Sequence, residues 1–84
     1  NGKFDKTKLN KIASMTHNGY ARSINPVHTM ADGDSIYALS VGEVEADLNT
    51  VGTLSARVMS MAIENAIKSA ESMYGLTAYK DLKF

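Results

Sequence analysis

Apolar residues recur at helical spacing in two long stretches of the chain, which are separated by a stretch with strand-like alternation. Over residues 7–23 the apolar and small positions follow the i, i+3, i+4, i+7 spacing of a helix with one buried face. Asp5 and Thr7 are candidate N-caps for this helix. Pro26 disfavours helical geometry in the residue before it, so the helix is predicted to end at about Ile24.

A second and more apolar helix is predicted from a cap at Asn49 or Thr50 to about Tyr74. Asp47 places a negative charge at its N-terminus, and Gly75 is its expected C-cap. Small residues along this helix would let it lie close to a sheet or to another helix: Gly52, Ser55, Ala56, Ala62, Ala66 and Ala70.

Two further features predict contacts between elements. Gly19 lies inside the first helix, where glycine costs about 1 kcal/mol relative to alanine, so we expect another element to approach the backbone there. The tail from Leu76 to Phe84 carries too many apolar groups for a free end, and we expect it to dock on the rest of the chain.

Between the helices, residues 35–41 predict a strand that is covered on both faces, because neither alternating set is polar throughout. One set holds Ile36 and Ala38, and the other holds Tyr37, Leu39 and Val41. One strand cannot pair its own backbone groups. The helix, strand, helix order therefore predicts an α/β piece of a larger fold or of an obligate oligomer.

Composition limits the classes of protein that fit. The 84 residues form one unit, 1–84, with 44% hydrophobic and 21% charged residues and no cysteine, which excludes disulfides and thiol chemistry. The net charge is zero, so the uncompensated basic surface of a nucleic-acid-binding protein is not expected. No apolar run reaches about 18 residues, so we expect no membrane span. The absence of cysteine fits a cytoplasmic location, which we expect.

Candidate chemistry gathers before the predicted strand, at Asp32 and Asp34, which an extended backbone would aim to the same side. Three interpretations stand. The Asp-Gly pair is a hairpin-turn signal; the two acids with His28 are hard metal ligands; or the two carboxylates transfer protons. No serine has the setting of a nucleophile, and His17 is expected on the surface of the first helix.

The run Met15–Gly42, MTHNGYARSINPVHTMADGDSIYALSVG, resembles a family of self-processing aminopeptidases, peptidase family S58. The family includes the D-aminopeptidase DmpA, the beta-peptidyl aminopeptidases and the nylon-oligomer (6-aminohexanoate oligomer) hydrolases. The likeness extends to the chain end and implies most of the small, C-terminal subunit of an αββα sandwich of the DmpA/ornithine acetyltransferase type. In that family a precursor cuts itself before a Ser or Thr, which becomes the nucleophile.

The resemblance implies a nucleophile upstream of Asn1, catalytic Asp32 and Asp34, and no cofactor or metal. It implies a large N-terminal subunit as partner, a peptide or amide substrate, a homo-oligomer, and no activity in this chain by itself. Some peptidase members have Ser and Glu in place of the two acids, so the match is closer to the amide hydrolases with two Asp. The alternatives are an acyltransferase of the ornithine acetyltransferase type and a non-catalytic helical dimerisation module.

Overall fold

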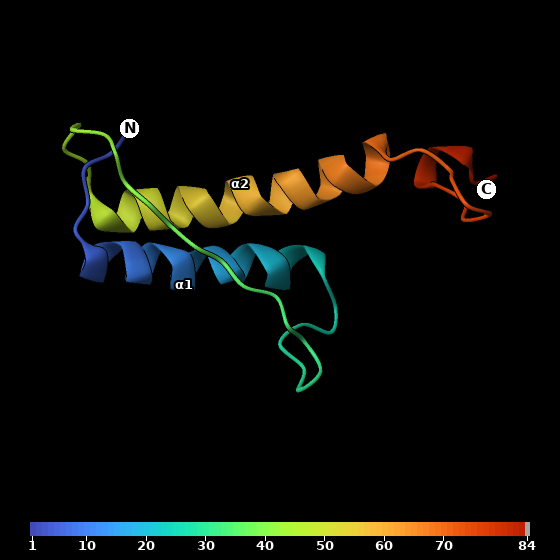
Figure 1. The fold of residues 1–84 in the computed structure, drawn as a ribbon, viewed down its shortest axis with the longest axis horizontal. Coiled ribbons are helices and arrows are strands. Elements are labelled where there is room, and N and C mark those ends of the chain that lie inside the picture. The colour runs from blue at the N-terminus through green and yellow to red at the C-terminus, as the bar shows by residue number, and fades with distance from the viewer. Residues whose placement is uncertain (84) are drawn as a thin grey trace.

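The chain folds around two parallel helices that lie side by side, as a computed structural model describing residues 1–83 shows. Helix α1 (Lys6–Ser23) and helix α2 (Leu48–Ser69) both begin at the end of the molecule where the N-terminus lies (Figure 1). A long connection between them runs back across the pair, and a short 3-10 helix, η1 (Tyr79–Asp81), follows α2. No helix within residues 1–83 is long and apolar enough to cross a membrane.

The bounds of α1 confirm the prediction from the sequence. The Asp5 side chain caps the helix by accepting a hydrogen bond from the Lys8 backbone N–H at 2.9 Å. Ile24 leaves helical geometry, and its N–H donates to the Tyr20 carbonyl at 2.7 Å. A capping carboxylate and a following proline therefore define the two ends of this helix.

Both ends of α2 differ from the prediction. Its N-cap is Asp47, whose carboxylate accepts from the Thr50 N–H at 2.9 Å and the Thr50 hydroxyl at 3.0 Å, so Asn49 and Thr50 are not the caps. The helix ends at Ser69 rather than at about Tyr74. Gly75, with φ +79°, lies in a later turn and is not the C-cap.

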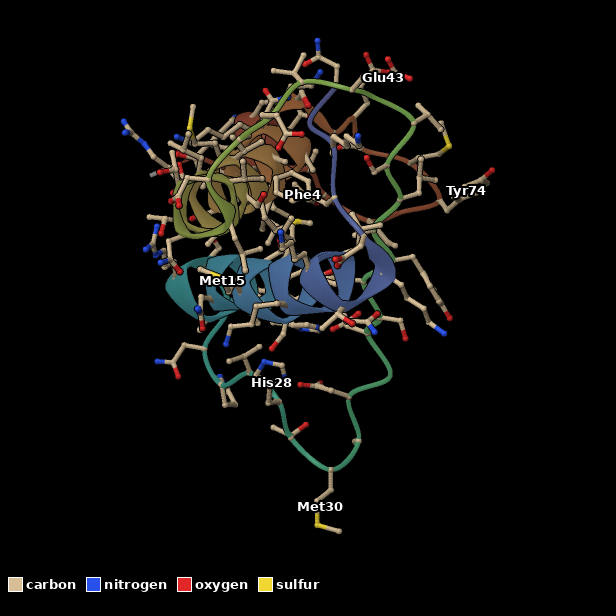
Figure 2. The ribbon with its side chains drawn as sticks, turned by 90° about the vertical axis from the view of Figure 1, so that its left-hand side faces the viewer. Phe4, Met15, His28, Met30, Glu43 and Tyr74 are labelled. Atoms are coloured by element: carbon tan, nitrogen blue, oxygen red, sulfur yellow. The ribbon has the colours of Figure 1, made fainter. Side chains whose placement is uncertain are left out.

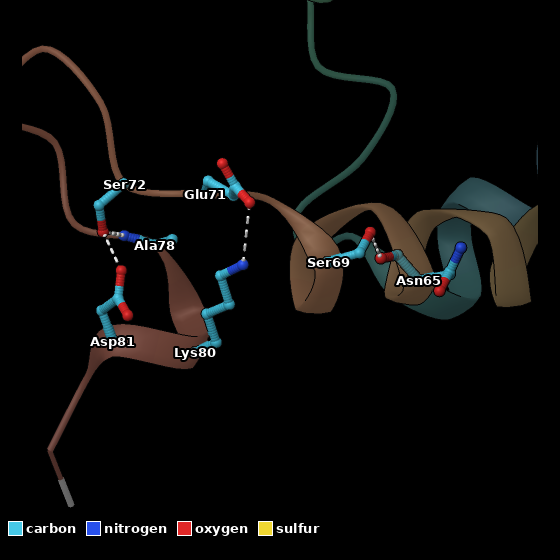
Figure 3. Close-up of polar contacts among 7 residues, drawn as sticks. All are labelled: Asn65, Ser69, Glu71, Ser72, Ala78, Lys80 and Asp81. Carbon is cyan, nitrogen blue, oxygen red and sulfur yellow. Dashed lines mark hydrogen bonds and ion pairs between the residues drawn. The ribbon is translucent and has the colours of Figure 1, made fainter.

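The early end of α2 has a local cause, which Figure 3 shows. The Ser72 hydroxyl accepts from the Ala78 N–H at 2.7 Å and lies 2.5 Å from the Asp81 carboxylate. These side-chain bonds give the backbone after Ser69 an alternative to continuing the helix. The expected docking of the tail is only partial, because Leu82 remains 48% exposed. Phe84, which that expectation included, lies outside the described residues.

The two helices pack closely through small residues, as the sequence predicted. A Cβ atom at Gly19 would lie 2.5 Å from the Ala56 carbonyl oxygen, and one at Gly52 would lie within 2.5 Å of the Met15 sulfur. One turn further on, the Ser23 and Ser60 hydroxyls are 2.6 Å apart. Ala56 and Gly52 are buried, whereas Ala62 and Ala66, in the part of α2 that extends past α1 (Figure 1), and Ala70, just after α2, are exposed.

The predicted strand at 35–41 is wrong for this chain, since the described residues contain no paired strand there. A single parallel β-bridge joins Gly2 and Val44, with the Lys3 N–H donating to the Val44 carbonyl at 2.8 Å. Burial does alternate over residues 35–42 of the connection: the even-numbered positions are half-buried, and the odd-numbered positions are exposed.

Only one face of this connection is therefore covered, and the expectation that both faces are covered is also wrong. Tyr37 is 94% exposed, Leu39 81% and Val41 90%. A strand is defined by bonds to a neighbouring strand, and the described residues supply none beside 35–41. The helix pair agrees with one helical layer of a larger fold, and the αββα sandwich remains a prediction.

Candidate active site

A small polar cavity lies between α1 and the loop that follows it, and it collects the candidate residues. Figure 2 shows His28 just beneath α1, with Met30 at the tip of the loop pointing away from the helix. The cavity has a volume of about 110 Å³. It is lined by His17, Tyr20, Val27, His28, Thr29, Asp32 and Asp34.

Asp32 lies at the end of a tight turn and bonds to Thr29, at the start of that turn, through both its backbone and its side chain. Its N–H donates to the Thr29 carbonyl at 3.0 Å, and its carboxylate accepts from the Thr29 N–H at 2.9 Å. The turn therefore spans 29–32, and the hairpin expected around Asp32-Gly33 is wrong. Gly33 does not have the positive φ that the central residues of a type I′ hairpin turn require.

Asp34 lies two residues after Asp32 in the chain and lines the same cavity. Both acids are exposed, so solvent or another molecule can reach them. This placement agrees with the expectation that the two side chains point to the same side of the backbone. The structure therefore brings two carboxylates to one small cavity, and their role in proton transfer stays a prediction.

His17 is not the surface residue that the sequence predicted. It is half-buried, and its Nδ1 atom is buried without a hydrogen-bond partner among the described residues. The ring lies 5.3 Å from Tyr20 in an edge-on arrangement and 5.0 Å from the ring of His28, measured between centroids. A signal was present in the sequence, because position 17 is four residues after Ala13 and three before Tyr20, at the edge of the apolar face.

His28 has a backbone conformation that is uncommon outside glycine. Its φ is +57°, in the left-handed region, where Asn, Asp and His are the side chains most often found after Gly. This residue leads directly into the Thr29–Asp32 turn. No three His, Asp or Glu side chains in the described part of the chain are placed to hold a metal ion, so the geometry does not support His28 and the two acids as metal ligands.

The N-terminal residues lie against the same connection, further along it. The Ser40 hydroxyl donates to the Gly2 carbonyl at 2.6 Å and accepts from the Phe4 N–H at 3.3 Å. The Val44 N–H donates to the Asn1 carbonyl at 3.1 Å. One continuous segment, 32–44, therefore carries the two acids at its start and contacts the N-terminus at its end.

Comparison with known proteins gives one family. The sequence profile of peptidase family S58 matches residues 2–80. Proteins named uncharacterized aminopeptidases match from Mycobacterium tuberculosis and Mycobacterium bovis, each 32% identical over 86% of this chain and 25% of the relative. One from Mycobacterium leprae is 31% identical over 82% of this chain and 23% of the relative.

The chain thus spans about a quarter of the length of the curated relatives it matches. No solved structure matches it significantly.

Proposed function

Since the chain belongs to peptidase family S58, we propose that it is the C-terminal part of a self-cleaving aminopeptidase or amidase with an N-terminal nucleophile. The enzyme would hydrolyse the amide bonds of peptides or aminoacyl amides. The observation that carries the proposal is the family match over 2–80, together with two carboxylates that line one cavity.

In the proposed reaction, the hydroxyl oxygen of a Ser or Thr upstream of Asn1 attacks the amide carbonyl. The hydroxyl proton passes to the α-amine of that residue or to the Asp32/Asp34 pair, and then to the amine that leaves as the C–N bond breaks. Water attacks the resulting ester, releases the acid and restores the hydroxyl. Self-cleavage would use the same attack on the peptide bond before the nucleophile.

The direction of the N-terminal residues supports a nucleophile near the acids. Gly2 and Val44 form a parallel bridge, so the two segments run the same way. Residues that precede Asn1 in the proposed precursor, and keep this direction, would run beside 43–35 toward Asp34. In a parallel pairing that keeps the register of the Gly2–Val44 bridge, a nucleophile about nine residues upstream of Asn1 would lie level with Asp34.

The uncovered face of the connection supports a large N-terminal subunit as the partner. Tyr37, Leu39 and Val41 form a row of exposed apolar side chains that a paired sheet would cover. Because the nucleophile and most of the pocket would then lie outside this chain, we propose that residues 1–84 alone do not turn over a substrate.

The test is the processing of the full-length precursor. Mass spectrometry should find two fragments, with the smaller one beginning at a Ser or Thr upstream of Asn1. Changing that residue to Ala should abolish both cleavage and release of the amine from an aminoacyl amide. An intact protein that hydrolyses the amide, or an active Ala variant, would overturn the proposal. Transfer of the acyl group to an added amine in preference to water would identify an acyltransferase instead.

A further inference from the structure

The ring contact between His17 and His28 joins the loop that carries the acids to a rigid helix. His17 projects from α1, and its ring also meets Tyr20 one turn along the same helix. On the loop side, His28 directly precedes the turn in which Asp32 is fixed by Thr29. The ring pair, with centroids 5.0 Å apart, is the aromatic contact between this loop and α1.

We propose that His17 is a positioning residue for the hydrolysis: through the ring of His28 it holds the Thr29–Asp32 turn, and so the Asp32 carboxylate, in place against α1. This inference rests on the proposed function, because it assumes that Asp32 acts in the reaction. His17 itself does not contact the substrate in this role.

The left-handed backbone of His28 argues for such a support. A residue other than glycine remains at φ +57° only where its surroundings hold it there. The loop around it is exposed at most positions, with Met30 fully exposed at the tip, so the packing that holds it comes from the α1 side. His17 and Tyr20 are the aromatic residues of α1 that line the cavity beside His28.

The ring of His17, rather than its nitrogens, carries this role. Its Nδ1 is buried without a partner among the described residues, and a buried polar atom without a partner contributes nothing favourable. A phenylalanine ring at position 17 preserves a flat aromatic face toward His28 and removes the unpaired atom. Phenylalanine should therefore rescue a loss that alanine causes.

The test uses the full-length enzyme and an aminoacyl amide substrate. His17→Ala should lower kcat on the order of 10- to 100-fold, because a misplaced catalytic group loses rate even where binding is intact. KM should stay within about twofold, since the substrate contacts are unchanged. His17→Phe should retain at least about a third of the wild-type kcat, whereas Asn18→Ala, at an exposed position of α1, should leave kcat unchanged.

A second variant keeps the test independent of folding defects. His28→Gly accepts the left-handed backbone without strain but removes the ring, so it should lose kcat as His17→Ala does. If the two rings act as one contact, the double variant should be no more than about threefold slower than the slower single variant. The inference would be overturned if the kcat losses of the two single variants multiply in the double variant. It would also be overturned by an unchanged kcat in His17→Ala, or by a His17→Phe enzyme as slow as His17→Ala.

Failure of this inference can be told apart from failure of the proposed function. If Asp32→Asn and Asp34→Asn lose activity while His17→Ala does not, the acids keep their role and only the positioning role of His17 is lost. If both Asn variants retain full activity, the acids have no role in proton transfer and this inference fails with them, whereas the proposed function fails if the enzyme stays active after its Ser or Thr nucleophile is changed to Ala.

Discussion

At the scale of single residues, small side chains determine how closely the two helices pack. Gly19 faces the Ala56 backbone, and Gly52 faces the Met15 side chain, one turn earlier on each helix. The Ser23 and Ser60 pair continues the same row one turn later. Contacts that recur every four residues on both helices are typical of ridges-into-grooves packing.

Gly19→Ala should destabilise the protein. The new Cβ would lie 2.5 Å from a backbone oxygen and 2.7 Å from the Met59 Cβ, so the helices must separate. Overpacking of this kind costs about 1 to 3 kcal/mol, whereas alanine gains only about 0.5 to 1 kcal/mol in helix propensity. Denaturant unfolding of the full-length protein should therefore show a lower midpoint.

Gly33→Ala is the matched control for this substitution. No atom lies within 4 Å of a Cβ at Gly33, and its φ is not left-handed, so alanine should be neutral or slightly stabilising. A Gly19→Ala protein as stable as the Gly33→Ala protein would contradict the close contact between α1 and α2.

At the scale of elements, each helix begins at an aspartate whose side chain caps it. Asp5 accepts from Lys8 and Asp47 accepts from Thr50, each three residues further along. The pKa of Asp47 is lowered from its ordinary value of 3.8, chiefly by the hydrogen bond from the Thr50 backbone N–H and then by that from its hydroxyl. The charged carboxylate is therefore the form that caps α2.

This cap predicts a pH dependence. A lowered pKa in the folded state means that the stabilisation is fully present above the unfolded value and is lost as the pH falls through the folded value. Asp47→Ala should lower the Tm at pH 7, and this difference from the wild type should shrink as the pH drops below about 3.8.

Asp47→Asn separates the charge from the hydrogen bond. It can still cap the helix but does not titrate, so its Tm should lie between those of the wild type and Asp47→Ala at pH 7. A Tm difference between Asp47→Ala and wild type that is the same at pH 3 and pH 7 would argue against the charged cap. Thermal unfolding followed by circular dichroism at the helix band gives the Tm of the wild type and of both variants.

The sequence predicted α1 to within a residue at each end, because a capping acid, an apolar face and a proline all agree there. It missed the end of α2, since helical periodicity continues past Ser69 and only the fold shows that Ser72 bonds to Asp81 and Ala78. It predicted that Asp32 and Asp34 share a side but not that His17 is half-buried, because the burial of His17 depends on a loop that returns beneath α1. The predicted strand at 35–41 is absent because alternation along one segment does not supply a pairing partner, and no other described segment pairs with these residues.

At the scale of the whole molecule, the chain exposes more surface than a complete domain of its mass. Its accessible surface is 6750 Å², against about 4,900 Å² for a folded monomer of 9.1 kDa. Its radius of gyration is 15.8 Å, against about 12 Å for a compact domain of this length. The core is correspondingly small: among the described residues, the buried ones are Ile12, Thr16, Gly19, Gly52 and Ala56.

The isolated chain should therefore self-associate. The exposed row of Tyr37, Leu39 and Val41 lies on an unpaired extended segment, which offers both apolar area and free backbone groups to a second copy. Sedimentation of residues 1–84 at micromolar concentration should show dimers or larger species, and Leu39→Lys should reduce them. A well-folded monomer would count against this expectation.

The most direct test of the central claim is the rate of the full-length enzyme with Asp34→Asn. Asparagine keeps the shape of the side chain and can still form hydrogen bonds, but it cannot take up a proton at the cavity shared with Asp32. If the pair transfers protons, self-cleavage and amide hydrolysis should both fall on the order of 10²- to 10⁴-fold while the subunits stay folded. Near wild-type rates in both reactions would contradict a catalytic role for Asp34.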